Sequence, residues 1–352
     1  MKKPEVLRVV KCCLPAILFD YKRKKASEDA SEINIDLQVD DLQVTTLCRL
    51  WAGMGHIHRV RISLPVGSTT SGNRTTGNDD IAIKHIIPPP SSQRSFGDHR
   101  KASSYRVEAN FYENLAQELI AKGVSVPTPY HVERGKGDSV IIAMSYHESK
   151  VNPTENQQRV RLVLSWLAQF HAMYWDADAA DRVVQQAGLQ AVGSYWYLAT
   201  RPDEHEEMPD HGWQGRLKRA ARAIDARLQR DPLQCVIHGD AKDANILMDE
   251  HGKVTFCDFH SVSIDDEKEA LEYYWNELKA RLPLNVSPAP TWEQLQDSME
   301  FAYADFYRFM SGWGFWGSGA ERRVIALLDR LDHGSKLATE EDYDEAVQRE
   351  FG

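Results

Sequence analysis

The sequence predicts an α+β protein with two lobes, in which a small antiparallel sheet is followed by a larger, mainly helical part. Short runs rich in strand-forming residues, separated by turn signals, occupy residues 42–145. From Thr154 onward, apolar residues recur at the spacing of helices that bury one face. The polar segment 145–150 joins the two patterns, and we expect a hinge there.

Residues 1–41 are predicted to form an N-terminal extension. Its apolar stretch, residues 9–19, follows Lys2 and Lys3, as the apolar part of a signal peptide would. However, Pro15 interrupts the stretch, a basic run follows it, and no small-residue cleavage site is evident. We therefore expect a helix packed on the surface of the protein.

Residues 42–64 are predicted to form two strands around the turn Gly53-Met54-Gly55, and residues 81–86 a third strand. The intervening residues 65–80 are rich in Gly, Ser, Thr, Asn and Asp, which predicts a loop. Three prolines open the polar stretch 88–101, so a second long loop is expected there.

A helix is predicted over residues 103–120, with Ser103 or Ser104 as its N-cap. Two further strands flank the turn at residues 135–138 and complete the sheet. In the helical lobe, Thr154 and Gln157 have the spacing of a capping box, and the helix that begins there contains His171. His171 is expected to lie in the core or to support the site from behind.

The composition excludes several classes of protein. Hydrophobic residues make up 42% and charged residues 27% of the chain, as in ordinary globular proteins. A net charge of −10 argues against a nucleic-acid partner and against attraction to anionic membranes. The five cysteines are an odd number without metal-ligand spacing, which indicates a reducing, cytoplasmic compartment. No apolar stretch approaches the length that spans a bilayer.

The densest chemical signal lies in residues 238–245, His-Gly-Asp-Ala-Lys-Asp-Ala-Asn, together with Asp258. This segment contains a carboxylate (Asp240), a cation (Lys242) and an amide (Asn245), and Asp258 is a second carboxylate. Phosphoryl transfer from a nucleotide needs such a set. One carboxylate orients the attacking hydroxyl, a cation neutralises the moving group, and oxygen ligands hold magnesium.

The predicted local structure brings two of these residues together. Residues 246–248 and 254–257 are two strand-forming runs around the turn signal at 249–252. In a hairpin, the start of the first strand lies beside the end of the second. Asn245 and Asp258 would then be close enough to share one metal ion.

These motifs resemble the catalytic loop of the protein-kinase-like superfamily. The His-Gly-Asp form, with glycine at 239, is similar to that of its small-molecule kinases: aminoglycoside phosphotransferases, choline kinases and ecdysteroid-kinase-like (CHK kinase-like) proteins. Asp258-Phe259-His260 stands where protein kinases have Asp-Phe-Gly. The resemblance covers roughly residues 42–320 and implies the bilobal protein-kinase-like fold.

The resemblance implies a role for each residue of the set. Asp240 would orient and deprotonate the acceptor, Lys242 would neutralise the transferring phosphoryl group, and Asn245 and Asp258 would hold Mg²⁺, with ATP as the donor. Residues 149–338 would then form the C-lobe with the catalytic loop and acceptor site. Residues 339–352 are expected to be an acidic tail outside the resemblance.

Residues 42–148 would form the nucleotide-binding N-lobe. Gly53 and Gly55 would let backbone N–H groups approach phosphates, although two glycines are also typical of a plain hairpin turn. Lys84 resembles the lysine that contacts the α- and β-phosphates, and Glu108 is its best candidate counter-charge. Backbone from Met144 to Tyr146 would read the edge of the adenine.

The acceptor is predicted to be a small molecule with a hydroxyl group, bound against C-lobe aromatic residues between Tyr273 and Trp316. One alternative is a catalytically inactive kinase-like module that only binds nucleotide. A protein kinase is a third possibility, but no Ala-Pro-Glu element of a peptide platform follows Asp258. The sequence does not identify the acceptor, a preference for ATP over GTP, or the oligomeric state.

Overall fold

The computed structural model describes residues 1–25, 37–68, 74–194, 196–257, 267–283, 289–314 and 321–351. The chain divides into two compact units, and each is discontinuous in sequence. The first comprises Met1–Val151, Gln186–Leu189 and Leu247–Cys257. The second comprises Asn152–Gln185, Gln190–Ile246 and Asp258–Gly352.

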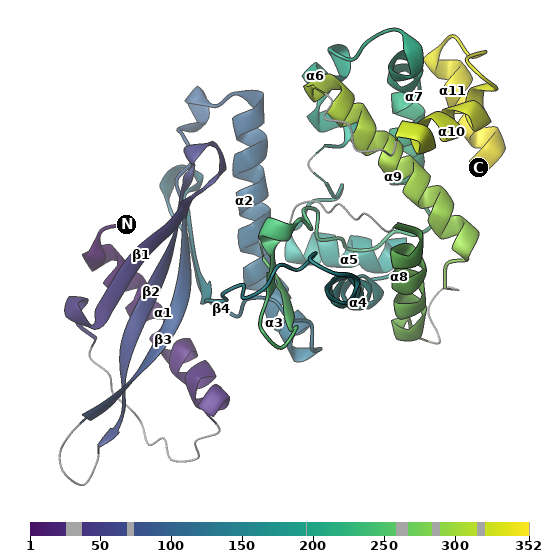
Figure 1. The fold of residues 1–352 in the computed structure, drawn as a ribbon. Helices are drawn as coiled ribbons and strands as arrows, with labels where there is room; N and C mark the ends of the chain where they lie inside the picture. The colour runs from purple at the N-terminus through teal and green to yellow at the C-terminus, as the bar shows by residue number, and fades with distance from the viewer. Residues whose placement is uncertain are drawn as a thin grey trace. The chain divides into compact units, whose positions relative to one another are not determined.

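The first unit is built on a five-stranded antiparallel sheet, which confirms the predicted sheet-containing lobe (Figure 1). The strand order is β1-β2-β3-β5-β4. The strands are β1 (Leu42–Arg49), β2 (Gly55–Ser68), β3 (Arg74–Ile86), β4 (Pro129–Arg134) and β5 (Val140–Ser145). Short 3₁₀ turns precede or join them: η1 (Val39–Asp41), η2 (Trp51–Gly53), η3 (Ser91–Gln93) and η4 (Lys136–Asp138).

The loop expected over residues 65–80 is wrong for residues 65–68 and 74–80, whereas residues 69–73 lie outside the described residues. Strand β2 continues to Ser68 and β3 begins at Arg74, with Leu64 opposite Gly77 and Pro65 opposite Thr76. These residues have low strand propensity, but propensity is a weak preference that cross-strand pairing overrides. The hairpin therefore extends well beyond the apolar core of its strands.

Helix α1 (Lys3–Lys25) lies along one face of the sheet, which confirms the predicted N-terminal helix (Figure 1). It contributes Val6, Val9, Val10, Cys13 and Ile17 to a core shared with Leu42, Val60, Ile62, Leu64, Ile81, Ile83, Ile141 and Ala143. Because these side chains are buried, the expected extension is part of the core of the first unit.

Helix α2 (Phe96–Asn114) begins earlier than predicted, and the proposed caps Ser103 and Ser104 are wrong. Ser95 is the N-cap: its hydroxyl accepts a hydrogen bond from the Asp98 amide, and the Asp98 carboxylate accepts one from the Ser95 amide. This reciprocal capping box starts a helix in a polar stretch that has no apolar periodicity. A short helix α3 (Ala116–Ala121) follows.

The hairpin predicted after Asn245 is present. It consists of β6 (Ile246–Met248) and β7 (Val254–Phe256), preceded by the 3₁₀ turn η6 (Asp243–Asn245). The Asp249 amide donates to the Lys253 carbonyl at 3.2 Å and closes the turn.

The remainder of the chain is mainly helical, as predicted. Its helices are α4 (Gln157–Met173), α5 (Ala177–Ala187), α6 (Pro202–Glu206), α7 (Gly212–Gln229), α8 (Glu267–Arg281), α9 (Trp292–Trp313), α10 (Glu321–Asp332) and α11 (Glu340–Phe351), with the 3₁₀ turn η5 (Leu198–Thr200). The predicted capping box at Thr154 is wrong, because Asn156 caps α4 through the Arg159 amide. No helix in the described part of the chain is long and apolar enough to cross a membrane.

Helix α11 replaces the acidic tail expected at the C-terminus. Tyr343, Ala346 and Val347 are buried in a core with α7, α9 and α10. The Tyr343 hydroxyl donates to Asp332 at 2.5 Å, and Asp332 also accepts two hydrogen bonds from Arg216 at 2.8 and 2.7 Å. The prediction failed because it considered only the acidic composition of this segment, although its apolar residues recur at helical spacing.

Candidate active site

Asp240, Lys242 and Asn245 of the predicted catalytic loop form a hydrogen-bonded cluster in the second unit. The Asp240 side chain is only 5% exposed, and its Oδ2 accepts hydrogen bonds from Lys242 Nζ at 2.7 Å and Asn245 Nδ2 at 2.9 Å. Asn245 is also buried, and its Nδ2 donates to the Asp240 carbonyl at 3.0 Å. Two donors therefore hold the carboxylate in one orientation, as a positioned base requires.

The backbone around Asp240 explains how so short a segment makes these contacts. Gly239 has φ +86°, a left-handed conformation that glycine adopts without steric cost. The Asp240 amide donates to Nδ1 of buried His238 at 3.2 Å. Thr154 donates to the Asp243 carboxylate at 2.9 Å and ties the loop to the start of α4.

Asn245 also fits the predicted magnesium site. Its Nδ2 makes both hydrogen bonds to Asp240, which leaves the amide oxygen as a hard ligand of the kind that Mg²⁺ prefers. Asp258, the second predicted ligand, lies outside the described residues, as do Phe259 and His260. The described segments contain no group of three or more His, Cys, Asp or Glu residues placed to hold a metal ion.

The predicted pair of Lys84 and Glu108 is present in the first unit. Lys84 Nζ lies 2.9 and 2.7 Å from the two carboxylate oxygens of Glu108, and the side chains are 1% and 10% exposed. Lys84 Nζ also lies 5.3 Å from the centroid of the Tyr105 ring. A buried ammonium group needs such a counter-charge, because burial without it is strongly unfavourable.

Alternation along β3 separates Lys84 from the core under α1. Ile81 and Ile83 pack in that core, so Ala82 and Lys84 point to the opposite face of the sheet. Met144 is opposite Ala82 in the adjacent strand β5. The residues expected to contact phosphate and base therefore share one face of one sheet.

The glycine turn lies at the Lys84 end of the sheet, since Gly55 pairs with Ile86. A Cβ atom at Gly55 would lie 2.0 Å from the His85 carbonyl oxygen, so close strand pairing requires glycine there. Within the turn, the Gly53 amide donates to Leu50 at 3.0 Å and the Met54 amide to Trp51 at 3.3 Å. These two contacts are typical of a plain hairpin turn, and a phosphate contact of Gly53 or Gly55 stays a prediction.

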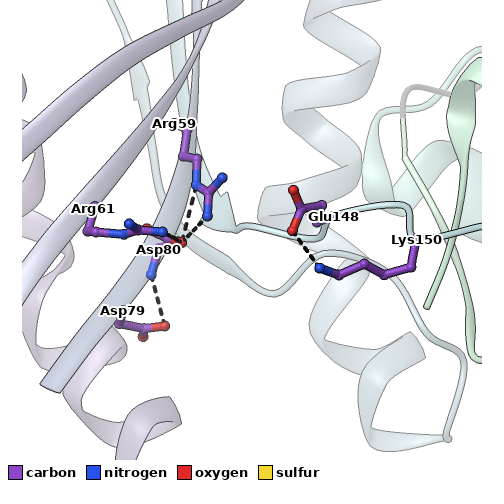
Figure 2. Close-up of polar contacts among 6 residues, drawn as sticks. All are labelled: Arg59, Arg61, Asp79, Asp80, Glu148 and Lys150. Carbon is purple, nitrogen blue, oxygen red and sulfur yellow. Dashed lines mark hydrogen bonds and ion pairs between the residues drawn. The ribbon is translucent and has the colours of Figure 1, made fainter. Parts of the chain in front are cut away.

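The segment after β5 makes contacts that the sequence reasoning missed. The Tyr146 amide donates to the Asp80 carbonyl at 3.3 Å, and the Arg59 guanidinium carbon lies 4.4 Å from the Tyr146 ring centroid. Asp80 in turn binds Arg59 and Arg61 (Figure 2). Alternating charged residues in β2, at 59 and 61, were the signal that could have identified this face.

His171 faces Tyr274, with Nδ1 2.7 Å from the tyrosine hydroxyl oxygen. Burial lowers the pKa of His171 to about 4 and raises the pKa of Tyr274 well above its usual value. Both groups are therefore neutral at pH 7.

The aromatic residues predicted to line the acceptor site differ in exposure. Phe301 and Tyr307 are buried in the core, Trp313 is exposed, and Phe315 and Trp316 lie outside the described residues.

The chain was compared with known proteins by sequence and by structure. None of the curated proteins compared with the chain matched it by sequence. Among solved structures, an aminoglycoside-3'-phosphotransferase of type VIII is 19% identical, with a TM-score of 0.33, over 82% of this chain and 93% of that one. The GDP and kanamycin complex of APH(2")-IIia is 11% identical, with a TM-score of 0.41, over 90% and 93%. An aminoglycoside phosphotransferase from Streptomyces rimosus is 14% identical, with a TM-score of 0.32, over 90% and 97%.

A protein-family model also matches the chain. Residues 93–287, more than half of the chain, match the phosphotransferase enzyme family APH. The matched segment includes Glu108, residues 145–150 and residues 238–245. The chain therefore belongs to the APH phosphotransferase family.

Proposed function

We propose that the protein is an ATP-dependent small-molecule kinase that transfers the γ-phosphoryl group to a hydroxyl of its acceptor. Membership of a phosphotransferase family supports the reaction class. The observation that carries the proposal is the buried Asp240 carboxylate, oriented by Lys242 and Asn245. An inactive nucleotide-binding module would not need a carboxylate positioned by two donors.

Asp240 orients the acceptor hydroxyl and takes its proton as the oxygen attacks phosphorus. The new O–P bond forms as the bond between the γ-phosphorus and the bridging oxygen breaks, and ADP leaves with that electron pair. Lys242 is 52% exposed and sits on a loop, so its ammonium group can leave Asp240 and contact the phosphoryl oxygens. Its charge then offsets the charge of the transferring group.

Lys84, fixed by Glu108, holds the α- and β-phosphates of the donor. Backbone of Met144–Tyr146 binds the base, and the turn with Gly53 and Gly55 covers the phosphate end. Asn245 and Asp258 would hold Mg²⁺, which neutralises phosphate charge when it is bound.

The five cysteines are all free thiols, which supports the proposed cytoplasmic location.

The acceptor is proposed to be a small molecule with apolar or cationic surface. A phosphoryl-transfer screen tests this, with Mg-ATP as donor and aminoglycosides, choline-like amines, sugars and sterols as acceptors. Phosphorylated product from one class, lost in Asp240→Asn, is the expected result. Nucleotide binding without transfer to any class would favour the inactive binding module, and phosphorylation of a protein substrate alone would favour a protein kinase.

A further inference from the structure

A second charged cluster lies on the Lys84 face of the sheet. Asp80 of β3 accepts hydrogen bonds from Arg59 at 3.2 and 2.5 Å and from Arg61 at 3.0 and 3.1 Å, both on β2 (Figure 2). Burial raises the pKa of Asp80, but the hydrogen bonds from Arg61 and Arg59 outweigh it and hold that pKa below its usual value. Asp80 therefore stays ionised between two guanidinium groups.

Strand register places this cluster relative to Lys84. Arg59 is opposite Ala82, which is opposite Met144, whereas Lys84 is opposite Ile57. Two residues along a strand span about 7 Å, so the row of Arg59 lies that far from the row of Lys84. If Lys84 binds phosphate and Met144–Tyr146 binds the base, Arg59 lies at the base end of the nucleotide.

Arg59 connects the cluster to the segment that would bind the base. Its guanidinium carbon lies 4.4 Å from the Tyr146 ring centroid, and the Tyr146 amide donates to the Asp80 carbonyl at 3.3 Å. Asp80 thus fixes Tyr146 in two ways. The Asp80 carbonyl accepts a hydrogen bond from the Tyr146 amide, and the Asp80 carboxylate orients Arg59, which contacts the Tyr146 ring. The backbone that follows Tyr146 is also fixed, because the Lys150 amide donates to the Met248 carbonyl at 2.8 Å.

We propose that Arg59 is a positioning residue for the donor base: Asp80 orients its guanidinium group, which stacks on Tyr146 and fixes the base-binding backbone. This inference rests on the proposed kinase function. An ordinary exposed ion pair contributes little to stability. A fixed cation–π contact at a binding segment instead lowers the ordering that the nucleotide must impose.

The chain offers a matched control. Arg61 lies on the same strand and the same face and binds the same carboxylate, and it is 41% exposed against 26% for Arg59. The stacking contact with Tyr146 is made by Arg59. Comparing Arg59→Met with Arg61→Met therefore separates the contact with Tyr146 from the loss of one charge beside Asp80.

The test is calorimetry of each full-length variant with Mg-ATP and with Mg-tripolyphosphate, which has the phosphates but no base. Arg59→Met should raise the Kd of ATP about fivefold or more and leave that of tripolyphosphate within about twofold. Arg61→Met should change neither by more than about twofold. Equal ATP affinity in Arg59→Met and Arg61→Met would overturn the proposal, as would an equal loss for tripolyphosphate.

Two variants at Tyr146 keep the test valid if Arg59→Met folds poorly. Tyr146→Phe keeps the ring and should bind ATP more tightly than Tyr146→Leu, whereas Tyr146→Leu should lose what Arg59→Met loses, with no further loss in the double mutant. Additive losses would contradict the stacking contact. A wild-type protein that binds no nucleotide would overturn the kinase function along with this inference, whereas ATP binding that is insensitive to Arg59 would overturn the inference alone.

Discussion

Two lysine–carboxylate pairs, one in each unit, have the same shortest distance of 2.7 Å but different surroundings. Lys84 and Glu108 are separated by 24 residues and are almost fully buried between a strand and a helix. Lys242 and Asp240 are two residues apart, and Lys242 is half exposed on a loop. Distance alone does not tell a fixed contact from an exchangeable one, whereas burial does.

The physical consequences differ accordingly. Breaking a pair that is buried on both sides leaves an uncompensated charge and costs about 3–5 kcal/mol. The pair of Lys242 and Asp240 is buried only on the carboxylate side. Lys84 is thereby held rigidly for a ligand that binds in one position. In the proposed reaction, the exposed Lys242 moves from Asp240 to the phosphoryl group, while Asn245 keeps its hydrogen bond to Asp240. The comparison predicts which replacements harm chemistry, binding or stability.

The largest effect is expected at the exchangeable pair, and it concerns chemistry. Asp240→Asn should lower kcat about 10²–10⁴-fold, because the base and its orienting charge are lost. Mg-ATP affinity should stay near the wild-type value. Asp243→Asn is the control, since this exposed carboxylate lies in the same loop and binds Thr154. A kcat within about threefold of wild type in Asp240→Asn would refute the base assignment.

The buried pair should instead respond in stability and donor binding. Lys84→Met removes the buried ammonium group that binds Glu108 and should lower the free energy of unfolding by about 3–5 kcal/mol, besides weakening Mg-ATP binding. Glu108→Gln should weaken ATP binding more mildly. Chemical denaturation and calorimetry of both single variants and the double variant measure the coupling. Effects that simply add would show that the two residues do not act as a pair.

A neutral, partly buried pair, His171 and Tyr274, tests whether its surroundings penalise charge. His171 has a folded-state pKa of about 4, below its ordinary value of 6.5, so folding favours the neutral ring. Its stabilisation is present above pH 6.5 and is lost as pH falls toward 4. Between pH 7 and pH 5 the wild type should lose roughly 2 kcal/mol more than His171→Asn. Equal pH slopes in denaturant titrations would exclude this role.

The smallest expected effect concerns the stability of the pair whose lysine is exposed. Lys242→Met should lower the free energy of unfolding less than Lys84→Met does, because Asn245 still donates to the buried Asp240 carboxylate, although the variant lowers kcat. Thermal unfolding and steady-state rates of the same preparation provide the comparison. A stability loss as large as that of Lys84→Met would mean that the catalytic-loop pair is structural, and the proposed exchange of Lys242 between partners would fail.

The sequence determined the features whose contacts are local. Asp240, Lys242 and Asn245 bond within five residues of one another, so their order along the chain nearly defines their geometry. The hairpin after Asn245 follows from a turn signal between two short strand-forming runs. Lys84 and Glu108 were paired from the sequence because a buried lysine needs a counter-charge and Glu108 lies on the helix face beside Phe111.

Only the tertiary structure decided the features that depend on distant partners. The packing of α1 on the sheet and the burial of α11 arise because apolar side chains find cores built by other elements, whatever the local composition. The contact of Arg59 with Tyr146 needs β2, β3 and β5 to be adjacent, an order that no local pattern encodes. Hydrogen bonds between residues close in sequence can be predicted from short motifs, whereas packing between distant elements depends on the whole fold.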